Sequence, residues 1–310
     1  MARQEGALLF SSGWVANLSA LGTLGRILPN CVFLSDAGNH NSMIEGMKRS
    51  KAEVRIFRHN DLNHLEELLS SCPPDASKVI AFEGIYSMDG SIGPVREICD
   101  LAGRYDAFTY LDEVHSAGLY GRQGAGIAAQ QGVADRVSMI QGTLAKSFGL
   151  MGGYVTGSSA AVDAVRSYAE SFIFSSSLPA HIASAASTSL DIIKAADGLR
   201  SELATRVREL RAALAYVGIP IVPGDTQIVP VMIGDAHLTE LTGSLLLDVC
   251  GIYAQPINYP TVPMGSERLR LTPTPYHDSH RVDDLVNALE ALATEMGWRE
   301  MNSWGARRAN

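Results

Sequence analysis

The sequence is poor in the features that mark disulfide-rich, metal-binding and membrane proteins. Its 310 residues include four cysteines, Cys31, Cys72, Cys99 and Cys250, which are far apart and form no CxxC pair. This distribution suggests neither a disulfide framework nor a zinc site, so we expect free thiols in a reducing cytoplasm and no bound metal. No apolar run approaches the ~20 residues that cross a bilayer, so no membrane association is expected.

Positive charge is also scarce. Lys and Arg number 25 against 33 Asp and Glu, which gives a formal net charge of −8. Nucleic-acid-binding domains normally carry a basic face, so no nucleic-acid partner is expected. Residues 1–6 lack the charged-then-apolar layout of a signal peptide. The apolar fraction of 46% and the charged fraction of 19% are ordinary for a folded globular protein.

Short apolar runs alternate with amphipathic stretches through the first part of the chain, which is typical of a mainly parallel α/β sheet. Strands are predicted at residues 79–82, 108–111, 137–140 and 154–156, and a helix at 94–105. In such sheets, ligand-binding residues gather at the carboxyl ends of the strands. The functional side chains should therefore follow these apolar runs.

From about Pro179 the pattern changes to that of a smaller α+β domain. A long helical stretch is predicted over residues 182–217, with a possible break at Gly198. The remaining predicted elements are strands at 228–233, 252–256 and 269–271 and helices at 238–249 and 282–296. We therefore predict a large domain over residues 1–195 and a small C-terminal domain over residues 196–310.

An aspartate and a histidine directly follow one predicted strand. Asp112 and His115 lie in the run Asp-Glu-Val-His. An Asp in an apolar setting needs a cationic or hydrogen-bonding partner to stay ionised. The protonated pyridine nitrogen of pyridoxal phosphate is such a partner, and His115 could reach the ring hydroxyl. A helix N-cap Asp with an incidental histidine would give the same local pattern.

A lysine among small and apolar residues follows the next predicted strand. Lys146 lies in the run GTLAKSFG, residues 142–149. Partial desolvation would lower the pKa of its amine and make it a nucleophile toward aldehydes. A surface lysine in a glycine-rich loop is the alternative. Together, Asp112, His115 and Lys146 fit a single cofactor better than coincidence does.

Three other positions could contribute to a ligand site. Residues 11–14, Ser-Ser-Gly-Trp, could present backbone N–H groups to a phosphate, or could form an ordinary helix cap. His40 precedes an amphipathic helix, where its ring could stack on a pyridine or simply cap the helix. Arg270 lies between two leucines, where a carboxylate ligand or a structural salt bridge could pair with it.

Seven stretches together resemble the fold-type I pyridoxal-phosphate enzymes, and within them the α-oxoamine synthases. They are NHNSMIEG (39–46), YSMDG (86–90), YLDEVH (110–115), GTLAK (142–146), FIFSSSLP (172–179), QPINYPTVP (255–263) and ERLRLTP (267–273). The resemblance extends from about Gly6 to about Met296. The lysine loop and the Asp-x-x-His run are shared by the whole family, whereas SMIEG and INYPTVP point to its 5-aminolevulinate synthase branch.

The resemblance implies a fold-type I α/β architecture with a mainly parallel, seven-stranded sheet in the large domain. It implies that Lys146 binds pyridoxal phosphate covalently and acts as the catalytic base. Asp112 would pair with the pyridine nitrogen, and His115 and Ser87 would bond the ring hydroxyl. His40 would stack on the ring.

The resemblance also implies a phosphate site and a dimer. The backbone of Gly13 and Trp14, together with Thr143, would bind the phosphate. Ser175 and Ser176 would reach the cofactor of the other subunit across a homodimer interface. The active site would then lie at that interface.

The implied activity is the pyridoxal-phosphate-dependent condensation of glycine with succinyl-CoA and decarboxylation to 5-aminolevulinate, CoA and CO2. Arg270 would bind the carboxylate of glycine. The product would enter tetrapyrrole and heme biosynthesis in the cytoplasm. The family carries a substantial segment before the equivalent of residues 7–10, which contributes acyl-CoA and dimer contacts, and this chain is expected to lack it.

Other functions fit parts of the same pattern. Another α-oxoamine synthase, either 8-amino-7-oxononanoate synthase or glycine C-acetyltransferase, is the nearest alternative, and the run at residues 257–263 argues against both. The same reaction could also supply a five-carbon unit for a secondary metabolite. A non-catalytic truncated partner subunit belongs to a different class, and it would have no need of Lys146, Asp112, His115 and Arg270.

Overall fold

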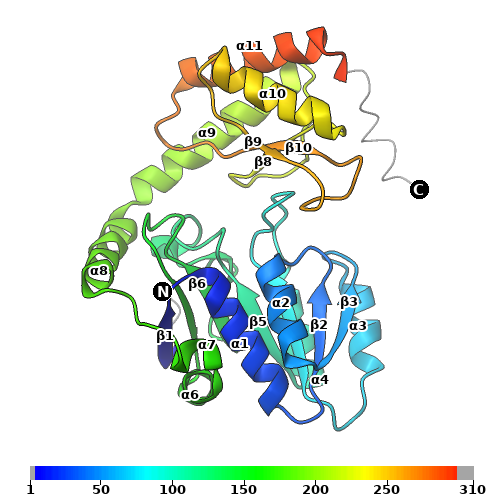
Figure 1. Cartoon of the computed structure of the whole chain (residues 1–310), viewed down its shortest axis with the longest axis vertical. Coiled ribbons are helices and arrows are strands. Elements are labelled where there is room, and N and C mark those ends of the chain that lie inside the picture. Colours follow the sequence, from blue (N-terminus) through cyan, green and yellow to red (C-terminus); the bar gives the residue numbers. More distant parts are fainter. Residues whose placement is uncertain (1–3, 299–310) are drawn as a thin grey trace. The chain divides into compact units, whose positions relative to one another are not determined.

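The computed structural model describes residues 4–298, which form parts of two compact units (Figure 1). The first unit consists of Met1–Tyr86 and Ile92–Asp197, and the second consists of Ser87–Ser91 and Gly198–Asn310. Residues 1–3 and 299–310, at the outer ends of the two predicted domains, lie outside the described residues.

A seven-stranded sheet forms the centre of the first unit, in the order β1-β7-β6-β5-β4-β2-β3. β7 pairs antiparallel with both its neighbours, and the remaining pairs are parallel. This confirms the predicted α/β fold with a mainly parallel, seven-stranded sheet. The strands are β1 (Gly6–Phe10), β2 (Val32–Asp36), β3 (Glu53–Phe57), β4 (Lys78–Glu83), β5 (Ala107–Asp112), β6 (Met139–Thr143) and β7 (Gly153–Gly157).

The apolar runs located some strands better than others. The predicted strands at 79–82, 108–111 and 154–156 lie inside β4, β5 and β7, while β6 starts two residues later than predicted. β2 and β3 carried too weak a signal for prediction. β2 is buried along its whole length, as are residues 79–82 of the correctly predicted β4, but it ends in the polar Ser35 and Asp36, and β3 is a largely exposed edge strand.

Nine helical segments in the described part of the first unit connect these strands. They are α1 (Gly13–Ile27), α2 (Asn41–Ser50), α3 (Leu62–Ser70), α4 (Val95–Tyr105), η1 (Arg122–Gly124), α5 (Ile127–Gln130), α6 (Ser159–Tyr168), α7 (Glu170–Ile173) and α8 (Ala180–Ala195). α1 and α2 lie side by side (Figure 1). A Cβ added to Gly46 of α2 would lie 2.8 Å from the carbonyl oxygen of Asn17, so the glycine permits this close packing.

The core of the first unit fixes α1 against the sheet. Its apolar face, which includes Ala16, Ala20 and Leu24, packs in one buried cluster with Tyr110 of β5 and Val155 of β7. The helix therefore starts beside the carboxyl ends of the central strands, where the sequence predicts ligand binding.

The second unit is built on a three-stranded antiparallel sheet in the order β8-β10-β9. Its strands are β8 (Val229–Met232), β9 (Gln255–Ile257) and β10 (Arg268–Leu271), and its helices are α9 (Asp197–Tyr216), α10 (Ala236–Asp248) and α11 (Ser279–Glu295). Apolar residues of all three helices and of β8 and β10 form its core. Among residues 4–298, none of the helices combines the length and apolar character needed to cross a membrane.

The predicted long helix at 182–217 is two helices, and its break differs from the prediction. α8 ends at Ala195 and α9 begins at Asp197, so the chain turns at Ala196 and Gly198 lies inside the first turn of α9. An acidic residue is favourable at a helix start because it faces the positive end of the helix dipole. Asp197 therefore marks the boundary better than the glycine does.

Candidate active site

A cavity of about 230 Å³ opens in the first unit where β4, β5 and β6 end. It is lined by Ser12, Gly13, Trp14, Asn17, His40, Ser42, Glu83, Asp112, Val114, His115, Thr143, Ala145 and Lys146. Seven of these are site residues predicted from the sequence, namely Gly13, Trp14, His40, Asp112, His115, Thr143 and Lys146. The structure thus brings together side chains that the chain separates by more than a hundred residues.

Lys146 and His115 are in direct contact in this cavity. The Nζ atom of Lys146 lies 2.8 Å from Nε2 of His115. Lys146 itself is exposed, so the prediction that its surroundings desolvate the amine is wrong. The neighbouring Ala145 is too small to cover it and is exposed as well. The histidine contact, rather than burial, defines the environment of this amine.

Asp112 is buried at the end of β5, and its carboxylate has specific donors. Its Oδ2 accepts a hydrogen bond from Nδ2 of Asn17 at 2.9 Å, and its Oδ1 accepts from the backbone N–H of Val114 at 2.8 Å. Burial raises the pKa of Asp112, while these hydrogen bonds and the nearby His40 and Lys146 lower it. No helix starts at Asp112, so the helix-cap alternative does not apply.

His40 lines the cavity and also caps α2. Its Nδ1 accepts a hydrogen bond from the backbone N–H of Ser42 at 3.2 Å and lies 2.7 Å from the Ser42 hydroxyl. The Trp14 ring meets the His40 ring edge to face, with centroids 6.1 Å apart. The capping role that the sequence left open is therefore real, and it coexists with a position in the cavity wall.

The start of α1 has the geometry of an anion site. Ser12 caps the helix by accepting a hydrogen bond from the N–H of Val15 at 3.2 Å. The other N–H groups of the first turn have no acceptor within the helix and carry the positive end of its dipole. A Cβ at Gly153 would lie 2.4 Å from the Ser12 carbonyl, so this glycine lets β7 pass close to the helix start. Thr143 completes this wall of the cavity.

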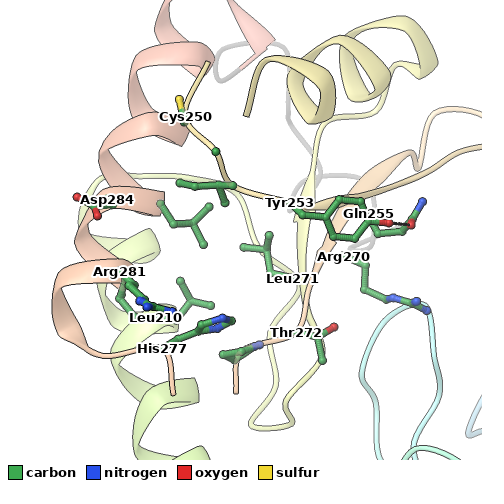
Figure 2. Close-up of a pocket in the computed structure, with 15 residues that line it drawn as sticks. Leu210, Cys250, Tyr253, Gln255, Arg270, Leu271, Thr272, His277, Arg281 and Asp284 are labelled. Atoms are coloured by element: carbon green, nitrogen blue, oxygen red, sulfur yellow. Dashed lines mark hydrogen bonds between the residues drawn. The ribbon is translucent and has the colours of Figure 1, made fainter. Parts of the chain in front are cut away.

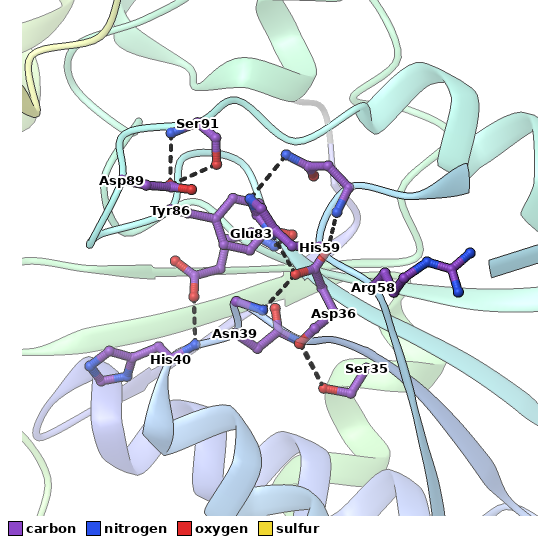
Figure 3. A network of polar contacts seen from close by, with 12 residues as sticks. Ser35, Asp36, Asn39, His40, Arg58, His59, Glu83, Tyr86, Asp89 and Ser91 are labelled. Atoms are coloured by element: carbon purple, nitrogen blue, oxygen red, sulfur yellow. Dashed lines mark hydrogen bonds and ion pairs between the residues drawn. The ribbon is translucent and has the colours of Figure 1, made fainter. Parts of the chain in front are cut away.

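A buried glutamate and an aspartate network hold the loop that carries His40 (Figure 3). Oε1 of Glu83 accepts a hydrogen bond from the backbone N–H of His40 at 2.6 Å. Asp36 accepts from the N–H of Gly38 at 2.7 Å and lies 2.7 Å from Nδ1 of His59. Burial and the neighbouring Asp112 raise the pKa of Glu83 well above its usual range.

Six lining residues were not among the predicted site residues, and three of them, Asn17, Ser42 and Glu83, bond to other groups of the site through their side chains. Glu83 pairs directly with Asp112 in the β4–β5 register, so a second acidic residue at the end of an apolar run was a usable signal. Asn17 and Ser42 lie inside helices and carry no local signal of that kind. Their importance comes from contacts between distant segments.

Ser87 and Arg270 lie together in the second unit. Nη1 of Arg270 donates to the backbone carbonyl of Ser87 at 3.3 Å, and burial lowers the pKa of Arg270. In residues 4–298, Arg270 forms no ion pair, so the salt-bridge alternative is not observed. Arg270 also borders a cavity of about 820 Å³ whose wall includes Tyr253, His277 and Arg281 (Figure 2).

The two predicted inter-subunit serines occupy neither cavity. Ser175 and Ser176 are exposed in the segment between α7 and α8. Over the described residues, no three His, Cys, Asp or Glu side chains are grouped closely enough to hold a metal ion.

Comparison with known proteins places this arrangement among enzymes. The family model described as aminotransferase class I and II matches residues 2–289. The 5-aminolevulinate synthase 2 of Cereibacter sphaeroides is 52% identical over 95% of the chain and 72% of its own length. The 5-aminolevulinate synthase of Rhizobium meliloti is 52% identical over 93% of the chain and 72% of its own length.

Solved structures agree with this picture. A serine palmitoyltransferase variant from S. paucimobilis with bound PLP–myriocin aldimine has a TM-score of 0.90 and is 31% identical, covering 96% of this chain and 74% of its own. An 8-amino-7-oxononanoate synthase from Francisella tularensis, 23% identical with a TM-score of 0.81 over 96% of this chain and 84% of its own, shares the fold. The chain spans roughly three quarters of the length of the two 5-aminolevulinate synthases and of the serine palmitoyltransferase.

Proposed function

The chain belongs to the 5-aminolevulinate synthase family within the class I and II aminotransferases, and from this membership we propose that it condenses glycine with succinyl-CoA. The products are 5-aminolevulinate, CoA and CO2, and the cofactor is pyridoxal phosphate. The observation that carries the proposal is that Lys146 and Asp112 line one cavity, as a cofactor held at both ends requires.

The cavity residues fit the cofactor group by group. The amine of Lys146 suits the aldehyde, the Asp112 carboxylate suits the pyridine nitrogen, and the start of α1 suits the phosphate. When bound, pyridoxal phosphate supplies an electron sink that stabilises negative charge at the Cα of the amino-acid substrate. The buried Asp112 gains a cationic partner in this arrangement, which offsets the cost of burying its charge.

The protein groups then divide the proton chemistry among them. Lys146 would hold the cofactor, and its Nζ amine, when free, would take a proton from the glycine Cα and return it. His115, whose Nε2 lies 2.8 Å from Nζ, would orient this amine in the cavity. Hydrogen bonds from Asn17 and Val114 lower the pKa of Asp112 against the effect of burial, and so favour its ionised form beside a cationic ring nitrogen.

The remaining parts of the proposal concern substrate, partner and place. Arg270 pairs bidentately with the glycine carboxylate, and Ser87 bonds the cofactor ring hydroxyl. Two copies of the chain form a dimer in which Ser175 and Ser176 reach the other subunit's cofactor. The enzyme works in the cytoplasm and supplies tetrapyrrole and heme biosynthesis.

The test is a substrate panel on the purified, cofactor-loaded chain. Glycine, alanine and serine are each offered with succinyl-CoA, acetyl-CoA and palmitoyl-CoA, and products are identified by mass spectrometry. We expect 5-aminolevulinate from glycine with succinyl-CoA, and none from the Lys146→Ala variant. Lys194→Ala, which changes a lysine on α8 paired with Asp191, is the matched control. A different preferred pair, or a loaded wild-type protein without product, would overturn the proposal.

A further inference from the structure

One buried amide, that of Asn17, is linked by hydrogen bonds to Asp112 and, through Ser42, to His40. Asn17 is 1% exposed, on the face of α1 that packs against the sheet. A buried amide needs hydrogen-bond partners at both its oxygen and its nitrogen, because unsatisfied polar atoms are costly. Asn17 has them on both sides, and the two acceptors of its nitrogen, Ser42 and Asp112, line the cavity.

The orientation of this amide is fixed by its neighbours. The hydroxyl of Tyr110 donates to Oδ1 of Asn17 at 2.8 Å. Burial raises the pKa of Tyr110 well above its usual range, so the phenol keeps its proton and remains a donor. Tyr110 and Asp112 are two residues apart on β5 and so face the same side of the sheet. The ionised Asp112 only accepts, so Nδ2 of Asn17 must point toward it.

The same Nδ2 atom reaches a second target on α2. It donates to Oγ of Ser42 at 2.9 Å, and that oxygen lies 2.7 Å from Nδ1 of His40. Because the backbone N–H of Ser42 also donates to this Nδ1, the ring nitrogen is an acceptor and carries no proton. The Ser42 hydroxyl must therefore donate to His40, which leaves the ring proton of neutral His40 on Nε2.

From donor to acceptor, the hydrogen bonds therefore lead from Tyr110 to Asn17 and then divide into two branches. One branch ends at the Asp112 carboxylate and the other passes through Ser42 to the His40 ring. Gly46 holds Asn17 in place from α2, since there is no room for a Cβ between them. Turning or removing the amide would disturb both branches together.

We propose that Asn17 is a positioning residue that couples Asp112 to His40, fixing the carboxylate at the pyridine nitrogen and the tautomer of the imidazole at the ring face. The inference rests on the proposed function, because it assumes that these two side chains face pyridoxal phosphate. It assigns Asn17 no contact with the reacting atoms.

The test compares Asn17→Leu, Ser42→Ala and their double variant. Asn17→Leu keeps the approximate size of the side chain and removes both branches, whereas Ser42→Ala removes only the branch to His40. Thr23→Val is the matched control, since Thr23 is buried on the same helix and its hydroxyl has no hydrogen-bond partner. The readouts are the Kd for pyridoxal phosphate, the pH midpoint of the cofactor's visible absorbance, and kcat with KM for glycine.

We expect Asn17→Leu to raise the Kd for pyridoxal phosphate about 10-fold, which corresponds to a loss of ~1.4 kcal/mol in binding free energy. Its absorbance midpoint should move to higher pH, because a less ionised Asp112 leaves less positive charge on the ring nitrogen. Ser42→Ala should lower kcat with the midpoint unchanged, and the double variant should be no worse than Asn17→Leu. Thr23→Val should match the wild type in every readout.

The inference is overturned if folded Asn17→Leu keeps the wild-type Kd and midpoint, or if Thr23→Val shifts them equally. Should Asn17→Leu fail to fold, Tyr110→Phe replaces it, because this change removes only the donor to Asn17. Its absorbance midpoint must also move to higher pH, by a smaller amount. A wild-type chain that binds the cofactor without making 5-aminolevulinate would sink the proposed function and leave this inference standing.

Discussion

At the scale of single residues, two buried carboxyl groups determine the electrostatics of the cavity. Glu83 and Asp112 end neighbouring strands in direct register, and both are almost fully buried. Burial raises the pKa of each, and the nearby charge of Asp112 raises the pKa of Glu83 further. The site therefore stores electrostatic repulsion that a cationic ligand group relieves.

This repulsion predicts how the stability of the cofactor-free protein depends on pH. The pKa of Glu83 is raised in the folded state, so its favourable contribution is complete below the unfolded value of about 4.5 and is lost as pH rises through the folded value. Glu83→Gln does not titrate and keeps an acceptor for the His40 N–H. The variant should become more stable relative to the wild type as pH rises from 4.5 to 8.

Urea unfolding at several pH values measures this difference. Glu67→Gln, which removes a negative charge from an exposed position on α3, controls for net charge. Unfolding free energies of wild type and Glu83→Gln that stay parallel from pH 4.5 to 8 would contradict the electrostatic account.

The cysteines give a second prediction at this scale. Cys31 and Cys99 are buried, and burial raises the pKa of each thiol to about 11, whereas Cys250 is exposed. Iodoacetamide at pH 7.5 should therefore alkylate Cys250 first and leave Cys31 and Cys99 intact until the chain unfolds. Peptide mass spectrometry over time measures the order, and equal native reactivity at all three would show that the burial is wrong.

The sequence predicted site residues where a local pattern exposed them. Lys146, Asp112 and His115 follow strand ends, and the structure gathers them as that rule requires. Asn17 gave no such signal, because its link to Asp112 joins residues 95 positions apart. The exposure of Lys146 could not be predicted from the sequence either, because it depends on which segments of the folded chain cover its loop.

At the scale of elements, the approach of β7 to the start of α1 shapes the phosphate end of the cavity. Gly153 opens β7 and lies against the cap residue Ser12, with no space for a side chain. A displaced Ser12 would turn the first-turn N–H groups away from a bound anion. The glycine is therefore part of the anion site although it contributes no side chain.

Gly153→Ala should lower the free energy of unfolding by about 1–3 kcal/mol through overpacking and should weaken pyridoxal-phosphate binding. Gly103→Ala is the matched control, because a Cβ there meets nothing within 4 Å inside α4 and should add about 0.5–1 kcal/mol. Denaturant titration and cofactor titration of both variants provide the data. A Gly153→Ala protein as stable as wild type would show that β7 and α1 have room to separate.

Element types were predicted well where the period of apolar residues was clear, and boundaries less well. β4, β5 and β7 each contain their predicted run. β3 was missed because it is a largely exposed edge strand with charged residues, Glu53 and Arg55, at alternate positions. The break between α8 and α9 falls at Ala196, where the acidic start of α9 outweighs the flexibility of Gly198.

At the scale of the whole molecule, the two units divide the proposed chemistry between them. The first contains the cavity with Lys146 and Asp112, and the second contains Arg270 bonded to the Ser87 carbonyl. The short segment Ser87–Ser91 belongs to the second unit although it lies within the sequence of the first. The chain pattern could not show this, because it follows from contacts with residues 226 and 268.

A dimer is the expected state of the working enzyme. Ser175 and Ser176 are exposed, as residues reaching another subunit would be in a single chain. Sedimentation velocity of the cofactor-loaded protein should give twice the mass of the chain, and Ser175→Ala with Ser176→Ala should weaken cofactor binding without changing that mass. A fully active monomer would contradict the dimer.

The central claim is that Lys146 and Asp112 bind the same pyridoxal phosphate molecule, and chemical trapping tests this claim most directly. The cofactor-loaded protein is reduced with borohydride, digested, and mapped by mass spectrometry. We predict that the added cofactor mass is found on one peptide, the one containing Lys146, and that Asp112→Asn retains it more weakly before reduction. Cofactor mass on another lysine, or on none in a chain that binds pyridoxal phosphate, would contradict the account.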